Sequence, residues 1–176
     1  NGLLGTDALC PEIIARRAGD EAGFLVGPTF NVGQAQHHMA FPGTITLKPS
    51  TMIASMLDWT ESLVRHGFER IYWLNGHGGN IATINAAFSE IYHGVTFAGA
   101  GANRPPLRCH LRNWWELSGV MDLCRELFPV GEGSHATPSE VSVTWAGYPE
   151  AVKSVAMTPR IAPTGPILDA DDYRRR

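Results

Sequence analysis

The stretch Arg70-Ile71-Tyr72-Trp73-Leu74-Asn75-Gly76-His77-Gly78-Gly79-Asn80 decides the fold of this chain. Its first five residues are a compact β-branched and aromatic run, typical of a strand buried on both faces. A glycine-rich turn follows the strand. After it, Ile84, Phe88 and Ile91 recur at helical spacing, and Gly94 is the expected end of that helix. The order strand, glycine turn and helix predicts a unit of parallel sheet.

Further strands and helices are expected on both sides of this unit. Apolar residues recur at helical spacing from Thr51 onward, where Ser50 is the expected cap and Gly67 the expected end. The alternation predicts one α/β domain over residues 1–176, with helices on both faces of a parallel sheet. The other expected elements are strands at 23–26 and 107–111, a helix through 13–18 that starts near Asp7, and a helix at 121–127.

Composition excludes several classes of protein. The 176 residues are 44% hydrophobic and 18% charged, which is ordinary for a globular domain. A net charge of −3, with no basic cluster before 174–176, argues against nucleic-acid binding. No apolar run approaches the length of a membrane span. Three scattered cysteines without a C-x-x-C pair argue against disulfides and thiolate zinc sites, so we expect a cytoplasmic protein.

The glycine turn is the expected ligand site, because open α/β sheets bind ligands where strands lead into helices. His77 stands at its centre as a candidate metal ligand or catalytic group. A phosphate cradle is a poorer interpretation, since neither a P-loop Lys-Ser/Thr pair nor G-x-G-x-x-G is present. A hydrogen-bonded loop histidine remains open as an alternative.

Three other positions have both a structural and a functional interpretation. Asp7 in a first helical turn complements the helix dipole, and it is also placed to bind a cation. Thr137-Pro138-Ser139-Glu140 matches a capping box, while His135 just before it could join Glu140 in proton transfer or metal binding. In the loop around His37-His38, at least one of the two histidines is expected on the surface.

Four motifs together resemble the creatininase (creatinine amidohydrolase) family. They are Gly-Thr-Asp at 5–7, His-His-x-x-Phe-Pro-Gly-Thr at 37–44, Asn-Gly-His-Gly-Gly-Asn at 75–80 and His-Ala-x-x-x-Glu at 135–140. The resemblance covers nearly the whole chain. It implies a three-layer α/β/α domain that holds two divalent metal ions (Zn, Mn or Fe). It also implies a homo-oligomer, which is a hexamer in this family.

The resemblance also assigns roles to residues. Asp7 falls on the bridging aspartate and His77 on a histidine ligand. His135 falls on a substrate-contacting histidine, and Glu140 on an acid/base or second-metal carboxylate. Creatininase proper carries a glutamate ligand of the second metal where this chain has Gly79, which places the chain in the broader family. That family's Glu-x-His metal motif is expected upstream of residue 1.

The expected reaction is hydrolysis of the C–N bond of a small amide, such as a cyclic amide or a formamide. Activated water would attack the carbonyl, and Glu140 or His135 would pass a proton to the leaving nitrogen. Gln34, His38, Gly78 and His135 are the expected substrate-binding residues. Asn75 and Asn80 are expected to shape the loop, with Asn80 as a helix cap. The alternative is a non-catalytic binding domain derived from the same family.

Overall fold

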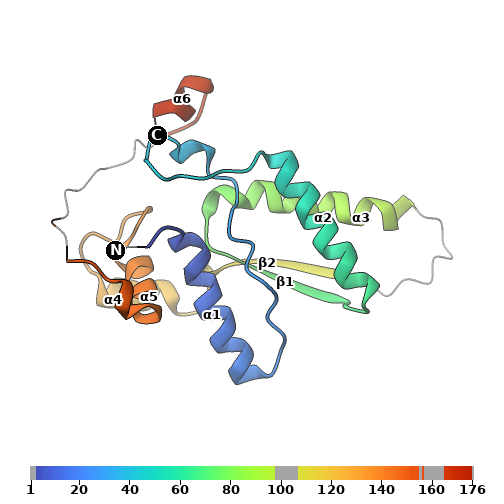
Figure 1. Cartoon of the computed structure of the whole chain (residues 1–176), viewed down its shortest axis with the longest axis horizontal. Coiled ribbons are helices and arrows are strands. Elements are labelled where there is room, and N and C mark those ends of the chain that lie inside the picture. Colours follow the sequence, from blue (N-terminus) through green and yellow to red (C-terminus); the bar gives the residue numbers. More distant parts are fainter. Residues whose placement is uncertain (1–2, 98–106, 155, 157–164, 176) are drawn as a thin grey trace.

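The computed structural model describes residues 3–97, 107–154, 156 and 165–175. Helices, two short strands and four 3₁₀ turns follow one another along the described chain, and the two strands flank α3 (Figure 1). The helices are α1 (Thr6–Ala22), α2 (Pro49–Arg65), α3 (Ile81–Phe97), α4 (Val120–Leu127), α5 (Pro138–Gly147) and α6 (Ala170–Arg175); the strands are β1 (Arg70–Asn75) and β2 (Arg108–Asn113); the 3₁₀ turns are Gln36–His38, Gly78–Asn80, Trp114–Glu116 and Pro149–Ala151.

The two strands form a parallel pair, and α3 lies between them in the chain. Their register runs from Arg70 opposite Arg108 to Asn75 opposite Asn113, so both strands end at the same edge. In Figure 1, α2 and α3 lie on one side of the strands and α1 lies on the other. This order confirms the predicted α/β class with helices on both faces. Within the described ranges the sheet has two strands.

The main core joins α2 and α3 to the sheet. Met52 and Met56 are one turn apart on α2, and Ile84 and Ala87 are one turn apart on α3, so each pair faces the same way. Trp73 of β1 and its register partner Leu111 of β2 pack against this cluster. Burial of each large side chain contributes about 1.5–3 kcal/mol. This packing fixes the edge where β1 and β2 end.

A second contact area joins α1 to α5 and to β1. Cys10 of α1 is buried, and its Sγ donates a 3.3 Å hydrogen bond to the carbonyl oxygen of Glu140 in α5. Burial raises the pKa of the Cys10 thiol to about 12, with smaller contributions from the negative charges of Glu140 and Asp7. A neutral, buried thiol is a packing residue. It holds the starts of α1 and α5 together.

The predicted strand at 23–26 is wrong. Helix α1 ends on Gly23, whose φ of 72° suits its left-handed cap position. Phe24 then donates its N–H to the carbonyl of Gly19, and Val26 folds back against Gly19. The run does not enter the sheet: Val26 touches the preceding helix at Gly19, while Leu25 stays exposed.

The predicted strands at 70–74 and 107–111 and the helix at 121–127 are confirmed within two residues at each boundary. The expectation that the first strand is buried on both faces is wrong, because Arg70 and Tyr72 of β1 are exposed. Helix α2 begins one residue earlier than Ser50, with Lys48 as its cap and Pro49 in the first position, where a missing N–H is harmless. Gly67 does end this helix, because N–H groups of Gly67 and Phe68 bond back to Val64 and Leu63. Gly94 does not end α3, which continues to Phe97.

No helix among the described residues combines the length and the apolar character needed to cross a bilayer.

Candidate metal centre

The glycine turn is shaped by asparagines, as the sequence predicts. Asn75 ends β1, and its Nδ2 donates hydrogen bonds to the carbonyl of His77 (2.8 Å) and to Oδ1 of Asn113 (2.7 Å). Its Oδ1 accepts the N–H of His77 at 3.2 Å. Asn113 ends β2, so the two asparagines join the strand ends while Asn75 also closes the turn. Both are buried, and these bonds hold His77 at the edge of the sheet.

Asn80 connects the turn to the segment around residues 34–38. Its Nδ2 donates to Oδ1 of Asn75 at 3.1 Å, and its Oδ1 accepts the N–H of Gln34 at 2.8 Å. Asn80 directly precedes α3, at the predicted cap position, and its side chain reaches back to Asn75 and across to Gln34. Gln34 is buried and is tied to the glycine turn through its main chain.

The turn needs glycine for space. Gly76 and Gly79 both lie outside the positive-φ region. A Cβ at position 76 would overlap the carbonyl oxygen of Asp7. A Cβ at position 79 would lie 2.5 Å from Nε2 of His77 and 2.5 Å from Cε1 of His37. Gly78 meets nothing within 4 Å and is exposed. Two of these glycines therefore allow other elements to approach the turn closely.

Asp7 and His77 meet at this edge. Oδ2 of Asp7, in the first turn of α1, lies 3.0 Å from Nδ1 of His77. The Asp7 side chain is 48% exposed, whereas the His77 side chain is 12% exposed. The predicted proximity of these two side chains, 70 positions apart in the sequence, is confirmed.

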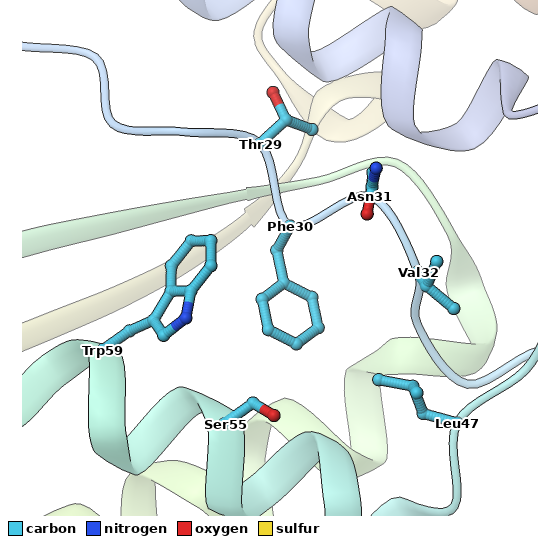
Figure 2. Close-up of a pocket in the computed structure, with 7 residues that line it drawn as sticks. All are labelled: Thr29, Phe30, Asn31, Val32, Leu47, Ser55 and Trp59. Atoms are coloured by element: carbon cyan, nitrogen blue, oxygen red, sulfur yellow. The ribbon is translucent and has the colours of Figure 1, made fainter.

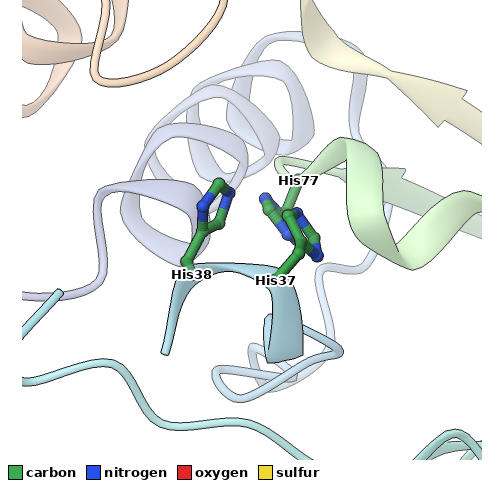
Figure 3. A group of neighbouring side chains, drawn as sticks. All are labelled: His37, His38 and His77. Carbon is green, nitrogen blue, oxygen red and sulfur yellow. The ribbon is translucent and has the colours of Figure 1, made fainter. Parts of the chain in front are cut away.

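Three further imidazole rings, those of His37, His38 and His135, gather beside this pair. The rings of His37 and His77 are stacked, with centroids 5.2 Å apart and planes 9° apart. The His38 ring lies 4.0 Å from that of His37 and 5.5 Å from that of His77. His135 brings the start of α5 into the group, with its ring edge-on to His38 at 4.9 Å. Figure 3 shows His37 and His38 projecting from one 3₁₀ turn toward His77.

The residues present fit a divalent cation. His37, His38 and His77 each offer a ligand nitrogen, and the three atoms lie within 4.8 Å of one another. Nε2 of His77 is buried and has no hydrogen-bond partner among the described residues. A buried polar nitrogen without a partner is costly, so a ligand at this position would satisfy it. Imidazole nitrogens with one carboxylate are a donor set typical of zinc and related ions.

The electrostatics keep His38 neutral. Burial of the ring, the largest cause, and the neighbouring imidazoles of His37, His77 and His135 together lower the pKa of His38 from 6.5 to about 4. The negative charge of Asp7 acts in the opposite direction but is the smallest contribution. A neutral imidazole is the form that binds metal ions.

Glu140 forms the predicted capping box. Its Oε2 accepts the N–H of Thr137 at 2.9 Å and the Thr137 hydroxyl at 3.2 Å, while the N–H of Glu140 donates to Thr137 Oγ1. Both bonds use Oε2, so Oε1 lies outside the capping box. Burial raises the pKa of Glu140, and the charges of Asp7 and Glu132 add to this, while the bonds from Thr137 lower it. A raised carboxyl pKa suits a proton donor.

The predicted substrate residues do not line the cavity that lies beside helix α2. That cavity, of about 240 Å³, lies between the segment preceding Gly33 and helix α2 (Figure 2). The rings of Phe30 and Trp59 meet in it edge-to-face at 5.2 Å. Its lining residues are Thr29, Phe30, Asn31, Val32, Leu47, Ser55 and Trp59. The metal-centre candidates lie outside it, so cavity shape does not identify the site here.

His37 is the residue that sequence reasoning missed. We expected at least one of His37 and His38 on the surface; both are partly exposed, and both rings lie against His77. The sequence did contain an indication, the adjacent pair His37-His38, because two adjacent histidines in a 3₁₀ turn can point into one site. Local sequence could not show that the turn is tied to the glycine loop through Gln34 and Asn80.

The fold and these residues define an α/β domain with a histidine-rich, carboxylate-containing site at the ends of parallel strands. The family model for creatininase (creatinine amidohydrolase) matches residues 1–174, and the chain belongs to that family. A creatinine amidohydrolase of Pseudomonas putida is 25% identical over 158 residues, which are 85% of this chain and 59% of that protein. This chain thus spans about three fifths of that relative.

Solved structures show the same fold. A creatininase variant complexed with creatine superposes with a TM-score of 0.77 at 24% identity, covering 98% of this chain and 71% of the other. A second creatininase variant, described as a Zn-Zn type, has a TM-score of 0.74 at 22% identity, covering 98% and 70%. At these identities the structural likeness confirms the α/β fold predicted for this chain.

Proposed function

We propose that this protein is a metal-dependent amidohydrolase that cleaves the C–N bond of a small amide. The observation that supports this most is the 3.0 Å approach of Asp7 Oδ2 to His77 Nδ1 beside a cluster of half-buried imidazoles. Membership of the creatininase family supports the reaction class. The proposal includes the two-ion site expected for the family, with zinc, manganese or iron as candidates.

Asp7 and His77 are the proposed ligands that fix the cation at the end of β1. When bound, the cation supplies a Lewis acid and lowers the pKa of water enough to provide hydroxide near neutral pH. Asn75 holds His77 through bonds to both its N–H and its carbonyl, so the imidazole is positioned before any ligand arrives. Such support for ligand residues is what a functional metal site requires.

Glu140 and His135 are the proposed proton-transfer residues. Burial raises the pKa of Glu140, which favours a carboxyl group able to donate a proton to a leaving nitrogen. His135 is exposed and stacks edge-on against His38, so it borders the cluster on the solvent side. From there it can contact a substrate. Glu140 is also a proposed ligand for a second cation.

The proposed substrate is a cyclic amide, a formamide or a related small amide. His38, Gly78, Gln34 and His135 are the proposed substrate-binding residues. Gly78 is exposed with open space around it, so a ligand can approach the main chain there. The similarity to a creatinine amidohydrolase favours small amides, while Gly79 favours a substrate other than creatinine.

A substrate panel tests the proposal. Metal-stripped protein is reloaded with Zn²⁺, Mn²⁺ or Fe²⁺ and assayed against cyclic amides, formamides and short peptides. We expect hydrolysis of at least one small amide that disappears with chelator and returns with the ion. Asp7→Asn removes a proposed metal ligand. Asp20→Asn makes the same change on the exposed part of α1 and is its matched control. Metal binding without hydrolysis of any panel member would contradict the proposed activity.

A further inference from the structure

The space beside Gly79 is filled by His37. A Cβ at position 79 would lie 2.5 Å from His37 Cε1, 2.5 Å from His77 Nε2 and 2.7 Å from the carbonyl oxygen of Gln34. The absence of a side chain at position 79 therefore lets the His37 ring stack on that of His77, with planes 9° apart. His37 reaches the buried side of the His77 ring, where Nε2 lies without a hydrogen-bond partner among the described residues.

The turn that carries His37 is held from several directions. Ala35 donates its N–H to Thr46 Oγ1 at 2.8 Å, and the Thr44 hydroxyl donates to the carbonyl of His38 at 2.9 Å. The N–H of His38 closes the turn on the carbonyl of Ala35, and Gln34 is bound to Asn80. Bonds on both sides of the two histidines fix their backbone relative to the glycine turn. Rigid support of this kind is a property of ligand sites.

The nitrogens of the three imidazoles come close to the spacing of ligands in a tetrahedral metal site. With Zn–N bonds of about 2.0–2.1 Å, two ligands of a tetrahedral ion lie about 3.4 Å apart. The ligand nitrogens of His37, His38 and His77 lie within 4.8 Å of one another. To reach a separation of about 3.4 Å, any two of these nitrogens must approach each other by about 1.4 Å or less, which small side-chain rotations provide.

We propose that His37 is a metal ligand and that His37, His38 and His77 form a three-nitrogen site that prefers Zn²⁺ and Co²⁺ to Mn²⁺ and Mg²⁺. The proposal rests on the metal dependence proposed above and adds two ligands and an ion preference to it. The Asp7 carboxylate contacts Nδ1 of His77 and orients the ring from that side, while the buried Nε2 faces His37.

The ion preference follows from the donor atoms. Imidazole nitrogens suit zinc, cobalt, nickel and copper, whereas magnesium and manganese favour carboxylate, carbonyl and water oxygens. Three nitrogens against one carboxylate give a nitrogen-rich set. A change of one nitrogen donor to an oxygen donor should therefore move the preference toward Mn²⁺.

Competition titrations of the metal-stripped chain test the proposal without an enzyme assay. Zn²⁺ and Mn²⁺ affinities are measured by calorimetry, and the visible spectrum of the Co²⁺-loaded protein reports nitrogen ligation. The variants are His37→Ala, His38→Ala and His37→Glu. His110→Ala, on the exposed face of β2, is the matched control, and circular dichroism checks that each variant is folded.

We expect His37→Ala and His38→Ala each to lower Zn²⁺ affinity by about 100-fold, with a changed Co²⁺ spectrum, while His110→Ala binds like the parent. His37→Glu should raise the ratio of Mn²⁺ to Zn²⁺ affinity by about 10-fold or more. Unchanged Zn²⁺ affinity and Co²⁺ spectrum in both alanine variants, with loss of binding in Asp7→Asn, would overturn this inference and leave the proposed function standing. Absence of Zn²⁺ binding in the parent chain would overturn both.

Gly79→Ala gives a second test in which all three histidines are kept. The added methyl group would displace His37 or His77, so we expect a similar loss of Zn²⁺ affinity. Gly94→Ala, in α3 and away from the site, is the control, because a Cβ there meets nothing within 4 Å. Equal Zn²⁺ affinity in the two glycine variants would overturn the proposed place of His37 in the site.

Discussion

Gly76 lies so close to Asp7 that a Cβ on the glycine would overlap the aspartate carbonyl oxygen. The same Cβ would lie 2.8 Å from Cδ of Pro11, one turn farther along α1. This contact sets the first turn of α1 directly on the glycine turn. It is the reason that the Asp7 carboxylate reaches Nδ1 of His77.

Gly76→Ala should therefore be strongly destabilising. The clash is with main chain, which cannot move aside as a flexible side chain can, and overpacking of this kind costs about 1–3 kcal/mol or more. Urea denaturation measures the free energy of unfolding. Gly78→Ala serves as the control and should lie within about 0.5 kcal/mol of the parent, because the added methyl group faces open space. Equal stability of the two variants would show that α1 does not press on the turn.

Asn75→Asp tests how the strand ends are joined. The substitution keeps the acceptor for His77 N–H but removes the donor to the His77 carbonyl and to Asn113 Oδ1, and it buries a charge between two acceptors. We expect a loss of roughly 3 kcal/mol in the free energy of unfolding at neutral pH. Asn85→Asp, on the exposed side of α3, is the matched change and should have little effect. Similar losses in the two variants would contradict the role given to Asn75.

Glu140→Gln separates the capping role of Glu140 from its proposed chemistry. A glutamine oxygen can still accept the N–H of Thr137, so stability should fall by about 1 kcal/mol or less. A glutamine cannot donate a proton as a carboxylic acid does, so turnover of any amide found in the panel should fall about 10²-fold. Thermal unfolding and steady-state kinetics measure the two effects. Full activity in Glu140→Gln would leave only the capping role.

His38 makes a prediction about pH. Burial and the surrounding imidazoles lower the pKa of His38 to about 4 in the folded protein, whereas the unfolded chain has the ordinary value near 6.5. The unfolded state thus binds more protons between these values. The contribution of His38 to stability is present above pH 6.5 and is lost as the pH falls toward 4.

NMR titration of the metal-free protein measures this pKa directly. The His38 ring proton should titrate with a midpoint near pH 4 in the folded protein and near 6.5 in concentrated urea. A folded-state midpoint near 6.5 would mean that the His38 ring is solvated and does not pack among the other imidazoles.

The local part of the fold could be predicted because its signals are local. The run 70–74, the glycine turn and the helix after Asn80 each carry their own pattern of apolar and turn residues. The capping box at Thr137 and Glu140 was predictable for the same reason. The run 23–26 has the same apolar character as a strand, but Val26 packs on Gly19 of the preceding helix. That choice depends on a tertiary contact, which apolar character alone does not reveal.

The site was only partly predictable. Spacing alone did not distinguish a role of Asp7 at the helix start from a role in cation binding. The resemblance to creatininase motifs supplied its pairing with His77. The reason for two of the glycines is steric: Gly76 admits α1 and Gly79 admits His37. Both neighbours are distant in sequence, so their identity depends on the folded chain. His37 was missed for this reason, although it lies beside the predicted residue His38.

Zinc binding by the metal-stripped chain and by Asp7→Asn and His77→Gln is the most direct test that Asp7 and His77 hold a divalent cation. Calorimetry should show one or two Zn²⁺ ions bound by the parent and by the exposed-site control Asp20→Asn. Each of the two site variants should lose about 100-fold or more in affinity. Parent-like Zn²⁺ affinity in both Asp7→Asn and His77→Gln would contradict the assignment of the metal centre.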